Sequence, residues 1–306
     1  MITKTASHSE ETTVPQTVLV TGTSSGLGRR TAEVLAERGH TVVATMRAPQ
    51  GRDRAAAEAL IKTGDGSPGR ILVVEMDVRD DESVDAGVAA AIERAGGLDA
   101  VVNNAAYAIT GIGESVTSSQ LLDVLDTNLV GPQRVTRAVL PHLRPRRSGL
   151  LVFLSSGAGR LTVPGMGAYS ASKSGLEALA QAYRYELRPL GIDVSIVQPG
   201  AFPSNLAASQ VAGADENRLA DYAEVLQLAG AFMQQIGAIF AGPQPPDPRE
   251  VADAVADLVD TPSGQRPERV SVDRFMLGRA VTAINAGTKA PTDALLRELG
   301  LGAVVS

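Results

Sequence analysis

The stretch Thr17-Val-Leu-Val-Thr-Gly-Thr-Ser-Ser-Gly-Leu-Gly28 decides the fold. Its first four residues are apolar or β-branched and predict a short buried strand. Three glycines follow at 22, 26 and 28, which permit a tight turn and a close approach of the backbone to a ligand. Residues 29–38 have helical spacing of apolar side chains, and Gly39 ends that segment. The turn therefore lies at a helix N-terminus, whose free N–H groups can hold a pyrophosphate.

Strand and helix patterns alternate through the rest of the chain. Apolar runs at 41–45, 71–76, 98–103, 150–154, 193–197 and 269–272 predict six more strands. These runs are continuous rather than alternating, as expected for strands buried on both faces. We therefore predict an α/β fold, a Rossmann-type doubly wound parallel sheet of about seven strands with helices on both faces, in a single domain.

The pattern also divides the chain. Residues 1–16 are polar and are expected to form a flexible N-terminal tail, 17–272 form the Rossmann-fold domain, and 273–306 form a C-terminal extension with one helix near 293–299. Within the domain, 201–248 interrupts the alternation and is expected to be an insertion that covers the substrate. A long helix is expected over 120–143, with a break or bend at Gly131-Pro132.

Composition excludes several classes of function. The net charge is −6 without long runs of one sign, which argues against nucleic acid as a partner. The chain has no cysteine, and its three histidines are scattered, so no metal site is expected. No apolar run approaches eighteen residues, so no membrane span is expected. The N-terminal tail lacks the apolar core of a signal peptide, and we expect a cytoplasmic protein.

A second motif is Tyr169-Ser-Ala-Ser-Lys173. The residues after it predict a helix, on which positions i and i+4 share a face. A neighbouring cation lowers the pKa of a phenol toward the working range, so the pair suits proton transfer. Ser156 ends the apolar run before this helix and could converge on the pair. Taken alone, the motif also fits a surface pair on a helix, with Ser156 as a cap or loop start.

The end of the second strand indicates which cofactor the turn would bind. An acidic residue there would bind both ribose hydroxyls of NAD. The sequence instead reads Ala44-Thr-Met-Arg47, and the planar guanidinium of Arg47 can clamp the 2′-phosphate of NADP. An arginine at a strand end is also common as a plain surface residue. We therefore favour NADP(H) over NAD(H).

Taken together, the motifs resemble those of the short-chain dehydrogenase/reductase family over residues 17–272. The matching elements occur in the family's order and spacing. They are TGTSSGLG at 21–28, Asp77-Val78, NNA at 103–105, Asn128, Ser156, YSASK at 169–173 and Pro199-Gly200. Two departures are mild: Ala106 stands where the family has a glycine, and Ser204 replaces a threonine while keeping the hydroxyl.

The resemblance implies a role for each matching residue. Asn128, Ser156, Tyr169 and Lys173 would form the catalytic set: Ser156 bonds the substrate oxygen, Tyr169 moves the proton, Lys173 bonds the nicotinamide ribose, and Asn128 holds a water. Asp77 and Val78 would border the adenine, and Asn103 and Ala105 the adenosine ribose. Pro199, Gly200 and Ser204 would hold the nicotinamide carboxamide. The expected cofactor-binding residues are Gly22, Ser24, Ser25, Gly26, Leu27, Gly28, Arg47, Asp77, Val78, Asn103, Ala105, Tyr169, Lys173, Pro199, Gly200 and Ser204.

The expected function is an NADP(H)-dependent oxidoreductase that interconverts a carbonyl and a secondary alcohol by hydride transfer. The apolar content of the 201–248 insertion predicts a medium or bulky hydrophobic substrate, although the same residues could pack on the core or on another subunit. A non-catalytic NADP(H)-binding regulator on the same fold is the alternative, and a related dehydratase or epimerase is a third. The resemblance further implies a homodimer or homotetramer.

Overall fold

The computed structural model describes residues 14–203 and 210–305. Most of the predicted N-terminal tail therefore lies outside the described residues. Within them, the fold is built on one seven-stranded parallel sheet, which confirms the predicted class. The strands, in spatial order, are β3 (Arg70–Glu75), β2 (Thr41–Met46), β1 (Thr17–Val20), β4 (Ala100–Asn103), β6 (Gly149–Leu154), β7 (Ile192–Pro199) and β9 (Arg269–Val272).

The strand order reverses direction between β1 and β4, which are neighbours in the sheet. From β1 the chain builds outward through β2 to β3, and then returns to the other side of β1. The loops after β1 and β4 therefore leave the sheet in opposite directions and open a crevice at its carboxyl edge. Thr21 directly follows β1, and Asn103 is the last residue of the neighbouring strand β4. The glycine turn and the NNA motif therefore face one another at this edge.

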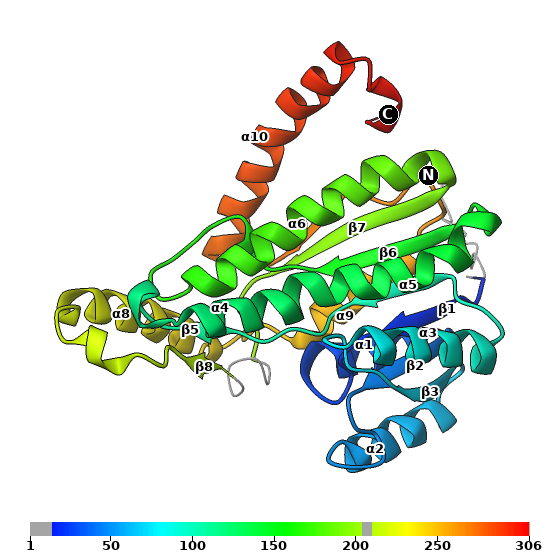
Figure 1. The fold of residues 1–306 in the computed structure, drawn as a ribbon, viewed down its shortest axis with the longest axis horizontal. Coiled ribbons are helices and arrows are strands. Elements are labelled where there is room, and N and C mark those ends of the chain that lie inside the picture. Colours follow the sequence, from blue (N-terminus) through cyan, green and yellow to red (C-terminus); the bar gives the residue numbers. More distant parts are fainter. Residues whose placement is uncertain (1–13, 204–209, 306) are drawn as a thin grey trace, which may run out of the picture.

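Helices cover both faces of the sheet (Figure 1). One face packs on α1 (Gly26–Glu37), α2 (Arg54–Asp65) and α9 (Pro248–Asp260), and the other on α3 (Asp81–Ala95), α5 (Gly131–Arg146) and α6 (Gly167–Leu187). In β1, Val18 and Val20 point to the first layer and Leu19 to the second. This alternation between two buried faces explains why the strands read as continuous apolar runs.

The long helix expected over 120–143 is three segments. These are α4 (Ser118–Leu125), a π-helix (Asp126–Val130) and α5. The expected irregularity therefore exists, but it lies one turn before Pro132 as a widened helical turn. π-Helical turns of this kind are often found at functional sites.

The region after β7 forms a lobe that extends from one end of the sheet (Figure 1). It contains β8 (Val211–Ala212), η5 (Glu216–Leu219) and α8 (Ala223–Phe240), and β8 pairs with β5 (Ile109–Thr110). None of the residues of α8 is buried. The proposed substrate-covering segment is therefore a separate apolar helix beside the carboxyl edge rather than part of the core.

The C-terminal extension contains much more helix than expected. α10 runs over Met276–Glu298, in place of the short helix predicted near 293–299, and η6 (Gly302–Val304) follows it. The first half of α10 packs against the body near β9 and η3 (Gly157–Gly159), where Val281 is buried. Its second half projects beyond α6 (Figure 1).

Candidate active site

A cleft of about 610 Å³ lies at the carboxyl edge of the sheet. The glycine turn forms one wall, and the ends of β2, β3 and β4 form the floor. Tyr169 and Lys173, from the start of α6, line the opposite end. The two motifs that the sequence analysis treats separately therefore share one cleft.

The glycine turn is held close to the loop after β4. Gly22 has a φ of +69° and Gly26 a φ of +59°, a left-handed region that favours glycine. A side chain on Gly22 would meet the Ala105 backbone at 2.9 Å, and one on Gly28 would overlap the Asn104 amide and the Gly22 carbonyl. Only glycine keeps this turn in place, and its backbone can then approach a phosphate at the start of α1.

Tyr169 is placed for proton transfer by its helix and its neighbour. It lies in the first turn of α6 with its side chain 5 % exposed, and its hydroxyl faces the Ser156 hydroxyl closely enough for Ser156 to lower the Tyr169 pKa. Ser156 follows β6, and its Oγ also accepts a hydrogen bond from the Ala158 N–H at 3.1 Å. The structure therefore brings the predicted hydroxyl pair together from two separate elements.

Lys173 lies one helical turn after Tyr169 and is 3 % exposed. Its Nζ donates to the Leu154 carbonyl at 2.7 Å and lies 5.9 Å from the centroid of the Tyr169 ring. The shared helix face predicted from the four-residue spacing is confirmed. The ammonium is held by the last residue of β6, directly before Ser155 and Ser156.

The predicted lowering of the Tyr169 pKa is not found in the described chain. Burial raises the pKa of the Tyr169 phenol to about 12, and the Ser156 hydrogen bond opposes this only in part. Burial also lowers the pKa of Lys173 to about 7, opposed by the charge of Glu177. Burial disfavours both the phenolate form of Tyr169 and the ammonium form of Lys173. It outweighs the mutual stabilisation of these two charges that the four-residue spacing alone suggests.

Asn128 lies in the π-helix and is fully buried. Its side-chain oxygen accepts from the Tyr107 N–H at 3.1 Å, and its Nδ2 donates to the Tyr107 carbonyl and to Ser172 Oγ. The side chain is therefore committed to holding the Tyr107 loop against α6. Its main-chain carbonyl cannot receive the usual α-helical hydrogen bond, because the residue four positions later is Pro132. A water bound by Asn128 would thus use the main chain.

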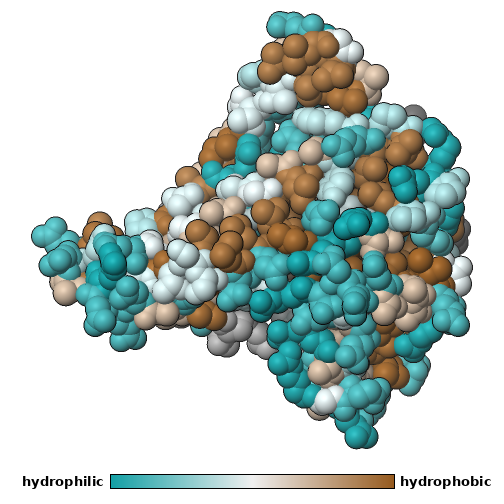
Figure 2. Space-filling view, viewed as in Figure 1, coloured by the Kyte–Doolittle hydropathy of each residue, from teal (hydrophilic) through white to brown (hydrophobic). Residues whose placement is uncertain are grey.

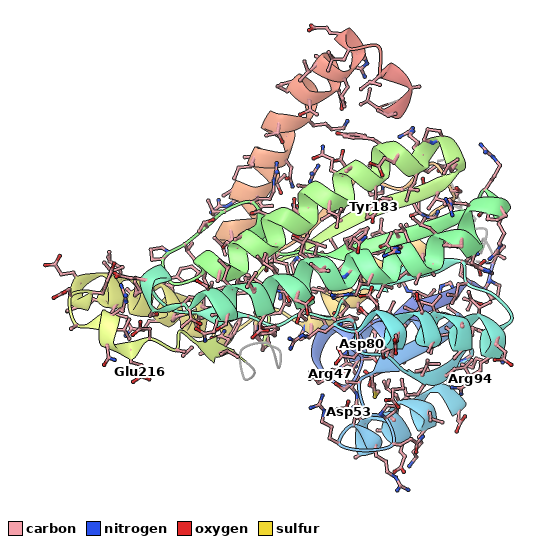
Figure 3. All side chains as sticks on the ribbon, viewed as in Figure 1. Arg47, Asp53, Asp80, Arg94, Tyr183 and Glu216 are labelled. Carbon is pink, nitrogen blue, oxygen red and sulfur yellow. The ribbon has the colours of Figure 1, made fainter. Side chains whose placement is uncertain are left out.

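Two arginines line the cleft near the ends of β2 and β3, and they differ in their partners. Arg79 is paired with Asp123 at 3.0 Å and Asp126 at 3.2 Å. Arg47 forms no ion pair with any residue in 14–203 or 210–305 and is exposed. Figure 3 labels Arg47 directly after β2, at the carboxyl edge. Its guanidinium is therefore free to bind an anion.

The other predicted cofactor residues lie at the carboxyl edge, with varied access to the cleft. Asp77, Val78 and Ala105 line it, as do the turn residues Gly22, Ser24, Ser25, Gly26, Leu27 and Gly28. Asn103 is 2 % exposed, and both polar atoms of its side chain lack a partner among the described residues. Pro199 ends β7, and Gly200 lies against Asp273, where a side chain would overlap the carboxylate. Ser204 lies outside the described residues.

Several residues of the cleft were not expected from the sequence. Asn104 donates from its side chain to the Thr21 carbonyl at 2.7 Å, and Thr21 Oγ1 accepts from the Asn104 and Ala105 N–H groups at 3.0 Å. These bonds fix the glycine turn to the NNA loop. The signal was present in the second asparagine of NNA. Ser155 and Glu177, next to Ser156 and one turn after Lys173, were also missed and form a buried pair behind the site.

Neither a metal centre nor a membrane span is found in the described part of the chain. It contains no group of three or more histidine, aspartate or glutamate side chains placed to hold a metal ion. None of its helices is both long and apolar enough to cross a bilayer.

Comparison with known proteins identifies the family. A family model described as short chain dehydrogenase matches residues 16–215. A 3-ketodihydrosphingosine reductase of Bacteroides thetaiotaomicron is 34% identical over 214 residues, which are 69% of this chain and 72% of that protein. A putative ketoacyl reductase of the monensin polyketide synthase of Streptomyces virginiae is 40% identical over 191 residues, 62% of this chain and 71% of that protein.

A solved structure agrees with these relatives. The crystal structure of a short-chain dehydrogenase from Streptomyces avermitilis superposes with a TM-score of 0.74 and 33% identity, and covers 93% of this chain and 96% of that one. The protein belongs to the short-chain dehydrogenase/reductase family, and its members are oxidoreductases that bind a nicotinamide cofactor. The family resemblance drawn from the sequence motifs is confirmed.

Proposed function

We propose that this protein is an NADP(H)-dependent reductase or dehydrogenase that interconverts a carbonyl and a secondary alcohol. The observation that carries the proposal is the shared cleft, which is lined by Tyr169, by the buried Lys173 and by the glycine turn, with Ser156 next to the Tyr169 hydroxyl. The relatives named as reductases of keto groups support the same reaction type.

The cleft fits a nicotinamide dinucleotide. Its glycine turn admits only glycine at Gly22 and Gly28, which leaves the space and N–H groups that a pyrophosphate needs. The unpartnered side chain of Asn103 lies below the same edge. A bound nicotinamide would supply the hydride, and Gly22, Ser24 to Gly28, Asp77, Val78, Asn103 and Ala105 would hold the adenosine and phosphate parts.

The protein's own residues handle charge and proton. As hydride reaches a carbonyl carbon, negative charge develops on the oxygen, which needs a donor and a proton at once. Ser156 donates a hydrogen bond to this oxygen from its Oγ. Tyr169 supplies the proton from its hydroxyl, and in the oxidative direction it receives one. The Lys173 ammonium stabilises the phenolate that remains, and the Asn128 main chain holds a water that connects Lys173 to solvent.

Arg47 supports a preference for NADP(H) over NAD(H). It follows β2, it lines the cleft, and its guanidinium has no carboxylate partner among the described residues. Arg79 also lines the cleft, but two aspartates neutralise it. A 2′-phosphate at the end of β2 would therefore meet one free guanidinium, which can bind it through two hydrogen bonds.

The 201–248 insertion supports a medium or bulky hydrophobic substrate. The partly buried residues of α8 form one stripe at helical spacing: Val225, Ala229, Phe232, Ile236, Ile239 and Phe240. This stripe faces the body, because a side chain on Gly165, in the loop before α6, would lie 3.6 Å from the Ala229 methyl. An apolar wall next to the loop that leads into α6 would favour an apolar group next to the reacting carbonyl.

Assembly as a homodimer or homotetramer in the cytoplasm completes the proposal. Figure 2 shows apolar surface over the region of α4 and α6. Leu121 and Leu122 on α4 and Val130 in the π-helix that follows it are large, exposed apolar side chains, with Leu122 67 % exposed. An apolar face of this kind suits contact with a second copy.

The experiment is a panel of ketones and aldehydes of increasing size, assayed with NADPH and NADH in parallel. We expect turnover of apolar ketones with NADPH and a much lower kcat/KM with NADH. Equal or better use of NADH would overturn the cofactor preference. Binding of NADPH without turnover of any carbonyl or alcohol would instead favour a regulator, and loss of water or epimerisation without net redox would favour a related lyase or epimerase.

A further inference from the structure

A buried polar cluster lies directly behind Lys173. Its centre is Glu177, one turn further along α6, with its side chain 2 % exposed. Glu177 Oε1 accepts from Ser155 Oγ at 2.9 Å and from Gln198 Nε2 at 2.8 Å. The carboxylate is placed as an acceptor only, which is how an ionised carboxylate acts.

Two guanidinium groups face the other oxygen of Glu177. Arg269 Nε, on β9, lies 3.4 Å from Oε2, and Arg160 Nε, directly after η3, lies 3.9 Å from it. Arg269 also pairs with Glu268. A buried carboxylate of this kind is costly unless it is paired, and these contacts supply the pairing.

The C-terminal helix is part of the same cluster. Asn285, on α10, donates from Nδ2 to Gln198 Oε1 at 2.7 Å, and Gln198 in turn donates from Nε2 to Glu177. Thr288 Oγ1, also on α10, accepts from Arg160 at 2.9 Å. α10 lies beyond the residues matched by the family model, which end at 215. A segment outside the matched region thus reaches the site through two polar contacts.

We propose that Glu177 is a positioning residue that keeps the buried Lys173 amine protonated, and that α10 holds Glu177 in place through Asn285 and Gln198. The role given to the positive charge of Lys173 rests on the proposed oxidoreductase activity. The titratable or charged groups around Lys173 and Glu177 come from three elements. They are Tyr169 and Glu177 itself on α6, Arg160 directly after η3, and Arg269 on β9. Among these, only Glu177 is an anion, and it lies one helical turn after Lys173 on α6.

The balance of charges explains why Lys173 needs such a partner. Burial lowers the pKa of Lys173 to about 7, and the Glu177 charge already acts against that lowering. Without Glu177 the amine would lose its proton at lower pH, and the phenolate of Tyr169 would lose its stabilising cation at neutral pH.

The direct test is a titration of Lys173 by NMR in the full-length chain without cofactor. The chain has four lysines, Lys4, Lys62, Lys173 and Lys289, so a sample with ¹³C-labelled lysine Cε gives four signals. The Lys173 signal is identified by its absence in Lys173→Arg. We expect its midpoint near pH 7 in the wild type, at lower pH in Glu177→Gln, and close to the wild-type value in Arg269→Gln, because Arg269 contacts Glu177 and not Lys173.

This pair of variants separates the electrostatic role from a structural one, since both disturb the same buried cluster but only Glu177→Gln removes the negative charge. Glu186→Gln is the matched control, because Glu186 is an exposed glutamate on the same helix. We expect it to leave the midpoint unchanged. If Glu177→Gln does not fold, the smaller downward shift expected in Asn285→Ala tests the proposal. An unchanged midpoint in folded Glu177→Gln, or in Asn285→Ala where only that variant folds, overturns it.

Activity supplies the second readout. If the wild type reduces a carbonyl, the alkaline limb of its kcat/KM profile should move to lower pH in Glu177→Gln, and in the same direction by a smaller amount in Asn285→Ala. An Asn285→Ala profile identical to the wild type overturns the part assigned to α10. If no carbonyl is reduced, the proposed function fails, while the NMR titration still decides the role of Glu177.

Discussion

The ammonium nitrogen of Lys173 lies 2.7 Å from the carbonyl oxygen of Leu154, inside the molecule. This contact fixes Lys173 between the end of β6 and the first turn of α6, next to the Tyr169 ring. It also places a cation where water cannot solvate it. The resulting pKa of about 7 makes the stability of the fold depend on pH.

The first prediction concerns this linkage. In the unfolded chain Lys173 keeps its proton up to its ordinary pKa of 10.5, whereas in the fold it releases the proton above about 7. Between these values the unfolded state binds more protons, so the Lys173 contribution to the free energy of unfolding rises with pH. Relative to Lys173→Met, wild-type stability should rise by up to about 1.4 kcal/mol per pH unit. Urea unfolding of both proteins between about pH 7.5 and 9.5 measures this difference. A difference in the free energy of unfolding that does not change with pH would contradict the burial of the Lys173 ammonium.

Tyr169→Phe tests the proton donor. The substitution removes only the hydroxyl, so the ring keeps its packing at 5 % exposure while Ser156 loses its partner. We expect kcat to fall by about 10²- to 10⁴-fold, the usual contribution of general acid catalysis. The affinity for NADPH, measured by the fluorescence of the reduced nicotinamide, should stay within about twofold of the wild type. The lost hydroxyl acts in the transition state of the reaction rather than on the bound cofactor. Retention of wild-type kcat would remove Tyr169 from the proposed mechanism.

The sequence predicts what depends on local pattern. Strand, glycine turn and helix are neighbours at 17–38, and Tyr169 and Lys173 lie on one helix, so spacing alone locates them. Glu177 was missed because its partners come from the residue after β6, from β7 and from β9. Such contacts arise only when distant segments fold together. The pKa of Tyr169 was misjudged for the same reason, since burial cannot be read from a four-residue spacing.

Helix boundaries were the other weak point. Pro291 lies inside α10, and a proline inside a helix normally costs a hydrogen bond and marks a boundary. The helix expected from the sequence began only after this proline, at 293. Packing of Val281 and the polar contacts of Asn285 instead stabilise the earlier turns. Tertiary contacts override the local preference here, as they often do for helices.

Gly28→Ala tests the glycine turn. A methyl group at this position would overlap the Asn104 side chain and the Gly22 carbonyl, and the carbonyl belongs to a backbone that cannot yield easily. We expect a loss of about 1–3 kcal/mol in the free energy of unfolding and a loss of NADPH binding. Gly287→Ala is the control: it lies in α10 with open space around it, and it should be neutral or stabilising by up to about 1 kcal/mol. Similar stability of the two variants would show that the turn tolerates a side chain.

Arg47→Ala tests the cofactor preference. Loss of charge-assisted hydrogen bonds worth about 1.5–3 kcal/mol should raise the KM for NADPH by about 10- to 100-fold and leave the KM for NADH nearly unchanged. Arg70→Ala is the matched control, because Arg70 is an exposed arginine at the opposite edge of the sheet, where β3 begins. It should affect neither cofactor. An Arg47→Ala variant that keeps its preference for NADPH would assign the 2′-phosphate to other groups.

The last prediction concerns α8. Phe232 lies on its inner stripe, whereas Leu228 points outward and is 63 % exposed. If the stripe covers the substrate, Phe232→Ser should raise the KM for bulky apolar ketones by about 10- to 100-fold, since burial of one large apolar side chain is worth about 1.5–3 kcal/mol. The KM for a small ketone should change little, because a small molecule does not reach the helix. Leu228→Ser should alter neither KM. If α8 instead packs on another subunit, Leu228→Ser would change the mass measured by light scattering. Steady-state kinetics with a homologous series of ketones, beside light scattering of both variants, therefore separates a substrate wall from a subunit contact.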